Sequence, residues 1–216
     1  MFLKPNGVLV FAGLALLTLT ACNGHEKPTA PPPTSASPET APPTERVVGP
    51  LSAADAQALS TMNDRLGEYI DLHTKLERSL PKLPKDATPQ QIDKNQRAFE
   101  ALMRNARATA KPGDIFTPEA RPVIKRLLAT VFGGPDGKQL KSSIMDENPV
   151  DPVALKIGVN SRYPDTVPLT SVPPQVLQTL PKLSEDLEYR FIGDWLILFD
   201  VHAHVIADYI DDALPK

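Results

Sequence analysis

Prolines divide this chain into segments more sharply than any other residue. There are 24 of them in 216 residues, and eight fall within positions 28–50. Proline lacks a backbone N–H and has a fixed φ, which excludes it from helix interiors and from central strands. The rest of residues 23–50 is mainly Thr, Ala, Ser and Glu, with too little apolar surface to offset the entropy of ordering. We therefore expect a disordered linker there, reaching up to about 80 Å when extended, and folded structure from Leu51 onward.

The first 21 residues have the pattern of a signal peptide. Lys4 precedes an apolar run over 8–19, and the small residues Thr20 and Ala21 follow it. This run is too short to cross a hydrocarbon core of ~30 Å as a helix. A signal peptide over residues 1–21 is therefore favoured over a transmembrane anchor.

Cys22, the single cysteine, follows this segment directly. Leu19-Thr20-Ala21-Cys22 resembles the lipobox of bacterial lipoprotein precursors. The resemblance implies cleavage before Cys22, a diacylglycerol on its sulfur and acylation of the new amino terminus; two or more acyl chains give stable membrane anchoring. The alternative is an ordinary secretory signal that contains a cysteine. We expect a lipid-anchored protein of the cell envelope that faces the periplasm, and Asn23 in place of aspartate favours the outer over the inner membrane.

Residues 51–148 are predicted to be helical. Ser52 and Asp55 resemble a capping box at the start of a helix over 53–80, which Pro81 and Pro84 end. Apolar residues recur there at alternating spacings of three and four, which indicates one buried face. That face consists of Leu59, Met62, Leu66, Tyr69, His73, Leu76 and Leu80.

Three more helices are expected in this region. Thr88-Pro89 begins one that ends before Pro112, and its short connection to the first helix predicts an antiparallel helical hairpin. Thr117-Pro118 begins another, which closes at Gly133; Pro122 is expected either to kink this helix or to move its start. A weaker helical pattern covers 136–147.

Residues 149–216 are predicted to form a small α+β region. Residues 154–159 are a candidate strand, and Pro173-Pro174 begins a short helix. Apolar and charged residues alternate over 187–191, Gly193-Asp194 makes a turn, and 195–200 and 205–209 read as two further strands. The expected fold class is α+β, in which a C-terminal three-stranded antiparallel meander with one buried face follows the helices.

Residues 173–210 also resemble known sequences. They include Leu-Glu-Tyr-Arg-Phe-Ile-Gly, Leu-Ile-Leu-Phe-Asp-Val and Val-Ile-Ala-Asp-Tyr-Ile. This stretch resembles the C-terminal region of uncharacterised exported proteins of proteobacteria and acidobacteria, and it is more distantly similar to small periplasmic nickel/cobalt homeostasis proteins. The latter usually have Gly or Asn where this chain has His204. The resemblance implies a periplasmic β-unit and transfers neither an activity nor metal ligands.

Asp200-Val201-His202-Ala203-His204 is the best candidate for a metal site. In one continuous strand, Asp200, His202, His204 and Asp208 would share a face, and two imidazoles beside carboxylates suit zinc, nickel or copper. In the alternative, residues 202–204 form a hairpin turn in which His204 adopts the left-handed conformation and the two imidazoles splay apart. His73, on the apolar face of the first helix, is expected to pack at a boundary or, alternatively, to act as a pH switch.

The composition excludes some function classes and leaves two main hypotheses, with an enzyme as a third option because an active site can be assembled from residues distant in the sequence. A net charge of −3 without a basic run gives no electrostatic footprint for nucleic acid. No nucleophile-elbow pattern or other catalytic motif occurs, and Glu185-Asp186 suggests a solvated loop. The first hypothesis is a non-catalytic envelope lipoprotein that binds a protein or cell-wall partner. The alternative is a periplasmic metal-binding or metal-stress protein that holds a divalent transition metal at Asp200, His202 and His204.

Overall fold

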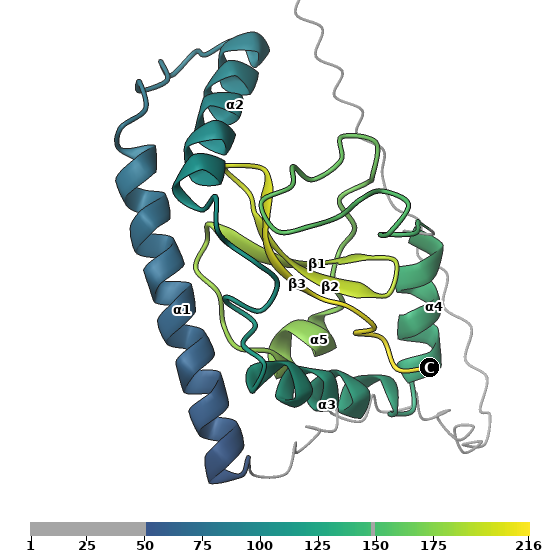
Figure 1. Cartoon of the computed structure of the whole chain (residues 1–216). Helices are drawn as coiled ribbons and strands as arrows, with labels where there is room; N and C mark the ends of the chain where they lie inside the picture. Colours follow the sequence, from purple (N-terminus) through teal and green to yellow (C-terminus); the bar gives the residue numbers. More distant parts are fainter. Residues whose placement is uncertain (1–50, 148–149) are drawn as a thin grey trace, which may run out of the picture. The chain divides into compact units, whose positions relative to one another are not determined.

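The computed structural model describes residues 51–147 and 150–216. Within these residues, five helices precede a three-stranded sheet (Figure 1). The predicted signal peptide, Cys22 and the proline-rich linker lie outside the described residues. The elements are α1 (Ala53–Glu77), α2 (Pro89–Ala106), α3 (Ala120–Phe132), α4 (Gly137–Glu147), α5 (Pro174–Thr179), β1 (Leu187–Ile192), β2 (Trp195–Asp200) and β3 (Val205–Ile210).

Helix α1 begins as its capping residue predicts. The Ser52 hydroxyl accepts a hydrogen bond from the backbone N–H of Asp55, which satisfies one of the free donors at the helix start. The helix ends at Glu77, three residues before the predicted end, and turns lead from there to Pro81. The predicted apolar face is buried or packed against the core.

The other predicted helices form, with small shifts at their ends. Thr88 and Gln91 make a full capping box for α2, which ends at Ala106. Helix α3 begins at Ala120, and the Thr117 hydroxyl accepts a hydrogen bond from the N–H of Ala120. Pro122 therefore lies in the first turn, where proline is tolerated, and the helix starts later than Thr117-Pro118 predicted. The chain reverses over 78–88, so α2 returns beside the C-terminal part of α1 (Figure 1).

The sheet is an antiparallel meander in the order β1-β2-β3, which confirms the predicted α+β class. Leu187 pairs with Asp200 at one end of the β1–β2 ladder, and Ile192 pairs with Trp195 beside the turn at Gly193. The β2–β3 ladder contains an irregularity between Leu198 and Phe199. This register places the start of β1 next to the β2–β3 turn.

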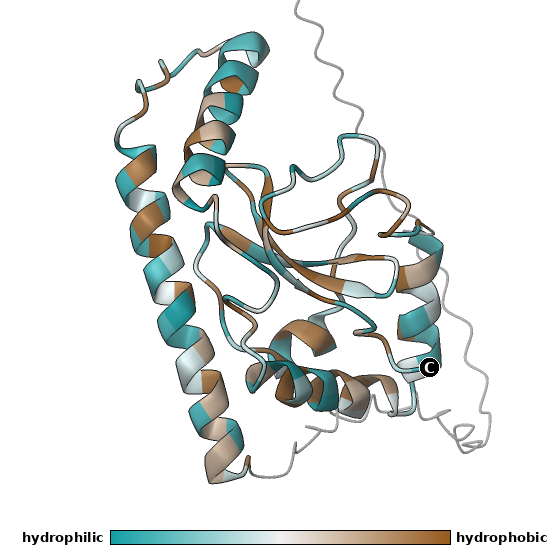
Figure 2. Cartoon of the chain, viewed as in Figure 1, coloured by the Kyte–Doolittle hydropathy of each residue, from teal (hydrophilic) through white to brown (hydrophobic). Residues whose placement is uncertain are grey.

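The main core lies on one face of the sheet and is closed by the helices. Figure 2 shows hydrophobic residues concentrated along the strands and on α3 and α5. Met62, Met103, Ile124 and Leu128 are completely or almost completely shielded from solvent. Burial of such apolar side chains stabilises the fold by roughly 1.5–3 kcal/mol each.

The second face of the sheet is also buried, so the prediction of one buried face is wrong. Ile192, Ile197, Phe199 and Ile206 form a second cluster on this face, which the segment 150–167 covers. The strand β2, Trp-Leu-Ile-Leu-Phe-Asp, has the near-continuous apolar run that suits burial on both sides.

The strand predicted at 154–159 is also wrong. This part of the covering segment consists of turns, in which Lys156 has a φ of 56° and the N–H of Ile157 donates to the carbonyl of Pro152. The apolar residues Leu155 and Ile157 suggested a strand in the sequence, and in the structure both pack against the second face of the sheet. They belong to a segment of turns, which packs on the sheet and adds no strand to it.

Candidate metal centre

The β2–β3 connection is a tight turn over residues 201–204. His204 has a φ of 58°, as the hairpin alternative predicts, and β3 begins at the next residue. A continuous strand through the two histidines is thereby excluded. The turn directs His202 and His204 to different surroundings.

Asp200 ends β2 and organises this turn from inside the protein. Its side chain is fully buried. Oδ1 accepts hydrogen bonds from the N–H groups of His202 (3.1 Å) and Ala203 (2.7 Å), and Oδ2 accepts one from the Tyr69 hydroxyl (2.7 Å). Burial, together with the charge of Asp200, raises the pKa of Tyr69 well above its ordinary value, so the hydroxyl keeps its proton for this bond. Asp200 therefore ties α1 to the hairpin.

His204 lies on the second face of the sheet, away from His202. Its ring packs edge-on against Phe199, with the ring centres 5.2 Å apart, and its Nε2 is 3.7 Å from Asp165 Oδ1. Burial lowers the pKa of His204. The structure thus does not bring His204 together with His202.

Asp208, which a continuous strand would have added to the same face, has a different role. Its carboxylate accepts hydrogen bonds from the backbone N–H groups of Gly113, Ile115 and Phe116. Burial raises the pKa of Asp208, and these N–H groups act in the opposite direction. Asp208 anchors the connection between α2 and α3 to β3.

His202 points toward two carboxylates that are distant in the sequence. Its Nδ1 lies 3.2 Å from Oε1 of Glu77 and 3.6 Å from Oδ1 of Asp186. Glu77 is the last residue of α1, and Asp186 directly precedes β1. The Asp186 carbonyl accepts a hydrogen bond from the N–H of Val201, which extends the β1–β2 ladder and places Asp186 beside the turn.

His73 approaches the same place from inside the protein. It has no exposed surface and packs edge-on against Phe99. Within the described part of the chain, neither of its ring nitrogens has a hydrogen-bond partner, although Nε2 lies 3.5 Å from Asp200 Oδ1. Burial lowers the pKa of His73, but the carboxylates of Asp200, Asp186 and Glu77 outweigh this effect and raise it. A buried polar group without a hydrogen-bond partner costs about 1–3 kcal/mol, and here the pair with Asp200 Oδ1 offsets part of that cost.

His73, Asp186 and His202 together can hold a metal ion. One ligand atom from each lies within 4.8 Å of the others, and the rings of His73 and His202 are 5.7 Å apart. Two imidazoles and a carboxylate are a ligand set that zinc and related divalent ions accept. Among the residues that the structure describes, this is the one group of three or more metal-ligating side chains that converges in this way.

Sequence reasoning identified His202 but missed its partners. His73 and Glu77 are four residues apart and share one face of α1, which was a readable signal. The placement of Asp186 follows only from the β1–β2 register, and the adjacent pair Glu185-Asp186 had suggested a solvated loop. No pattern in the sequence links α1 to the β2–β3 turn.

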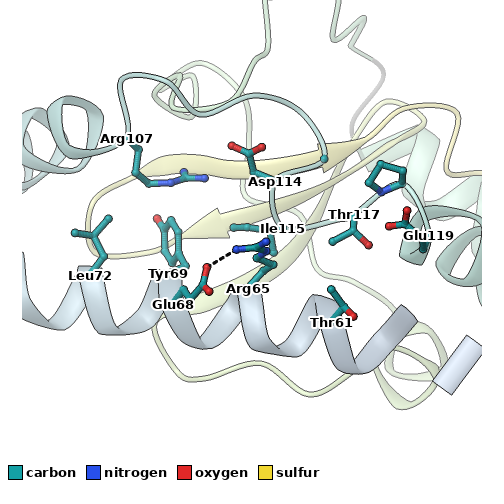
Figure 3. A pocket seen from close by; sticks show the side chains of 12 residues that line it. Thr61, Arg65, Glu68, Tyr69, Leu72, Arg107, Asp114, Ile115, Thr117 and Glu119 are labelled. Atoms are coloured by element: carbon teal, nitrogen blue, oxygen red, sulfur yellow. Dashed lines mark hydrogen bonds and ion pairs between the residues drawn. The ribbon is translucent and has the colours of Figure 1, made fainter. Parts of the chain in front are cut away.

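A groove of about 610 Å³ lies beside Tyr69, between α1 and the connection from α2 to α3 (Figure 3). Its two arginines are already engaged. Arg65 pairs with Glu68, and Arg107 donates to Asn160 and to the Ala207 carbonyl while it lies over the Tyr69 ring. Neither arginine is therefore left unpaired to define an anionic ligand.

Comparisons of the chain with protein-family models, with curated proteins and with solved structures found no match.

Proposed function

We propose that the protein is a non-catalytic lipoprotein of the cell envelope whose folded part binds a divalent transition metal ion through His73, Asp186 and His202. The observation that carries the metal function is the convergence of these three side chains, one of which is a fully buried histidine without a hydrogen-bond partner among the described residues. A bound ion would supply that partner.

The charge around the three side chains supports a cation. Glu77, Asp186 and Asp200 place three carboxylates around the two imidazoles. Tyr69 and two backbone N–H groups occupy the oxygens of Asp200, so Asp186 is left as the available carboxylate ligand. A carboxylate beside a ligating histidine is a common arrangement at protein metal sites.

The envelope location is proposed from the sequence. The lipobox Leu19-Thr20-Ala21-Cys22 supports an acyl anchor, and the proline-rich composition of 23–50 supports a spacer between membrane and folded part. Within residues 51–147 and 150–216, no helix combines the length and apolar character needed to cross a bilayer. A protein or cell-wall partner stays a prediction, because no described surface points to one.

The test is thermal unfolding of the full-length chain in mild detergent, with and without Zn²⁺, Ni²⁺, Co²⁺ or Cu²⁺. An ion that binds only the folded state stabilises it by about 2.7 kcal/mol at a hundredfold excess over its dissociation constant. For a chain of 216 residues this corresponds to about 5–11 °C in Tm. We expect at least one of the four ions to produce this shift.

His202→Asn and His204→Asn form a matched pair for this assay. Asparagine tolerates the left-handed backbone at position 204 better than most residues. We expect His204→Asn to keep the metal-dependent shift and His202→Asn to lose it. Loss in His204→Asn alone would refute the proposed ligand set, and no shift with any ion would refute the metal function.

A further inference from the structure

We propose that the connection between α1 and α2 binds an anionic membrane surface, namely the bilayer that holds the lipid anchor. The tip that makes this contact consists of residues 78–94, which include the first turns of α2. This inference rests on the lipid anchor at Cys22 proposed above and adds a second contact between the protein and the bilayer. Its basis is the charge of the tip, its exposed apolar side chains and the length of residues 23–50.

The tip is basic although the whole chain is acidic. Residues 78–94 contain four basic and two acidic residues, whereas the net charge of the chain is −3. One of the acidic residues, Asp93, is already ion-paired within α2. Arg78, Lys82 and Lys85 are exposed and form no ion pair with any residue that the structure describes. Each lysine or arginine beside an anionic lipid surface strengthens binding about fivefold.

Two large apolar side chains lie among these charges. Leu83 is 43% exposed and Ile92 is 49% exposed. The Asn95 side chain donates to the Pro81 carbonyl at 3.1 Å, which holds the connection against α2, and Ile92 lies one turn before Asn95. Leu83 and Ile92 therefore belong to the same end of the helical hairpin, where the connection lies away from the sheet (Figure 1). Apolar and basic side chains together suit the interface of an anionic bilayer, because the apolar groups enter the acyl boundary while the charges stay among the headgroups.

The tip is held in shape by its own contacts. Thr88 and Gln91 form the capping box of α2, and the N–H of Ala87 donates to the carbonyl of Pro84. Pro81 and Pro84 have a fixed φ. A surface that is already ordered loses less conformational entropy when it binds.

Residues 23–50 are long enough for the tip to reach the bilayer that holds Cys22. Helix α1 separates the start of the folded part from the tip, and its 25 residues make it about 38 Å long. Residues 23–50 can span up to about 80 Å when extended. The start of α1 can therefore stand about 38 Å above the membrane while the tip touches it, and the tether keeps the tip at a high effective concentration there.

The test uses the lipidated chain in vesicles with a fluorescent probe on the tip. Because the sulfur of Cys22 carries the lipid, Gln90→Cys introduces a single free thiol for the dye NBD, whose emission rises and shifts to the blue in apolar surroundings. Gln90 is exposed in the first turn of α2. We expect the blue shift in vesicles that contain phosphatidylglycerol and not in vesicles of phosphatidylcholine alone. Salt at about 0.5 M should reverse most of it by screening.

Asn63→Cys with the same dye is the matched control, because Asn63 is exposed on α1 away from the tip. Its emission should be the same in both kinds of vesicle. With the probe at position 90, Lys82→Gln/Lys85→Gln should lower the ratio of membrane-bound to free tips about thirtyfold. Leu83→Ser/Ile92→Ser should lower it about tenfold or more.

Two readouts separate the tip from the anchor. Emission from position 90 that is equal in both kinds of vesicle, or that Lys82→Gln/Lys85→Gln leaves unchanged, would overturn the lipid surface and leave a protein as the occupant of the tip. Flotation of the vesicles reports the anchor independently. A chain that does not float with them would refute the lipid anchor, and this inference would fall with it.

Discussion

Removal of one oxygen atom from Tyr69 should measure how strongly Asp200 ties α1 to the hairpin. The Tyr69 hydroxyl donates to Asp200 Oδ2 at 2.7 Å, and both side chains are buried. Tyr69→Phe leaves the ring, its packing and its contact with Arg107 in place. The variant therefore isolates one hydrogen bond to a buried carboxylate.

The expected loss follows from the charge of the acceptor. Hydrogen bonds to charged groups contribute about 1.5–3 kcal/mol to stability, against about 0.5–1.5 kcal/mol for neutral pairs. Asp200 keeps two backbone donors after the change, so hydrogen bonds still offset part of the cost of burying its charge. We expect Tyr69→Phe to lower the free energy of unfolding by about 1.5–3 kcal/mol, which is about 3–12 °C in Tm.

Urea unfolding followed by the fluorescence of Trp195, the single tryptophan, would measure this loss. Tyr189→Phe is the control, because the Tyr189 hydroxyl is also attached to a buried ring but donates to the neutral carbonyl of Pro181. We expect the control to lose about 0.5–1.5 kcal/mol. A loss in Tyr69→Phe no larger than in Tyr189→Phe would refute the argument from charge.

Three further outcomes are expected. Burial raises the pKa of Tyr163 to about 12, so the folded state keeps a proton that the unfolded chain releases near pH 10. The free energy of unfolding should therefore fall by up to about 2.7 kcal/mol between pH 10 and 12. Urea titrations should show that Tyr163→Phe lacks this part of the decline. A Cβ at Gly137 would lie 1.8 Å from the Phe132 carbonyl oxygen, whereas one at Gly67 meets nothing within 4 Å. Thermal unfolding should therefore show a loss of about 3 kcal/mol or more for Gly137→Ala and a gain of about 0.5–1 kcal/mol for Gly67→Ala, and equal effects would contradict this packing. Cys22→Ala should abolish the incorporation of radioactive fatty acid, and undiminished labelling would disprove the lipid anchor.

Local chemistry determined most of the secondary structure. Ser52 and Thr88 cap helix starts, and no helix continues through the prolines that follow it, because a missing N–H and a fixed φ act within one turn of the chain. The hairpin turn was predictable for the same reason, since few residues other than glycine, asparagine, aspartate and histidine tolerate the backbone that His204 adopts. Such signals need no knowledge of the rest of the fold.

The burial of the second sheet face depends on contacts across the chain. Residues 150–167 cover that face from a series of turns, and their apolar residues resemble a strand when only the local pattern is considered. A pattern of apolar residues predicts that a segment is buried, but which segment packs against it depends on the tertiary structure. For this reason the strand at 154–159 and the single buried face were both predicted wrongly.

The candidate metal site likewise combines features that the sequence predicts with contacts that only the folded chain makes. The sequence alone showed a histidine-rich turn, a histidine on an apolar helix face and the lipobox ahead of the folded part. Only the tertiary structure joined His202 to His73 and Asp186 and separated it from His204. Spacing along one strand or helix predicts which side chains share a face, whereas the meeting of α1 with the hairpin depends on how the apolar faces of distant segments pack together.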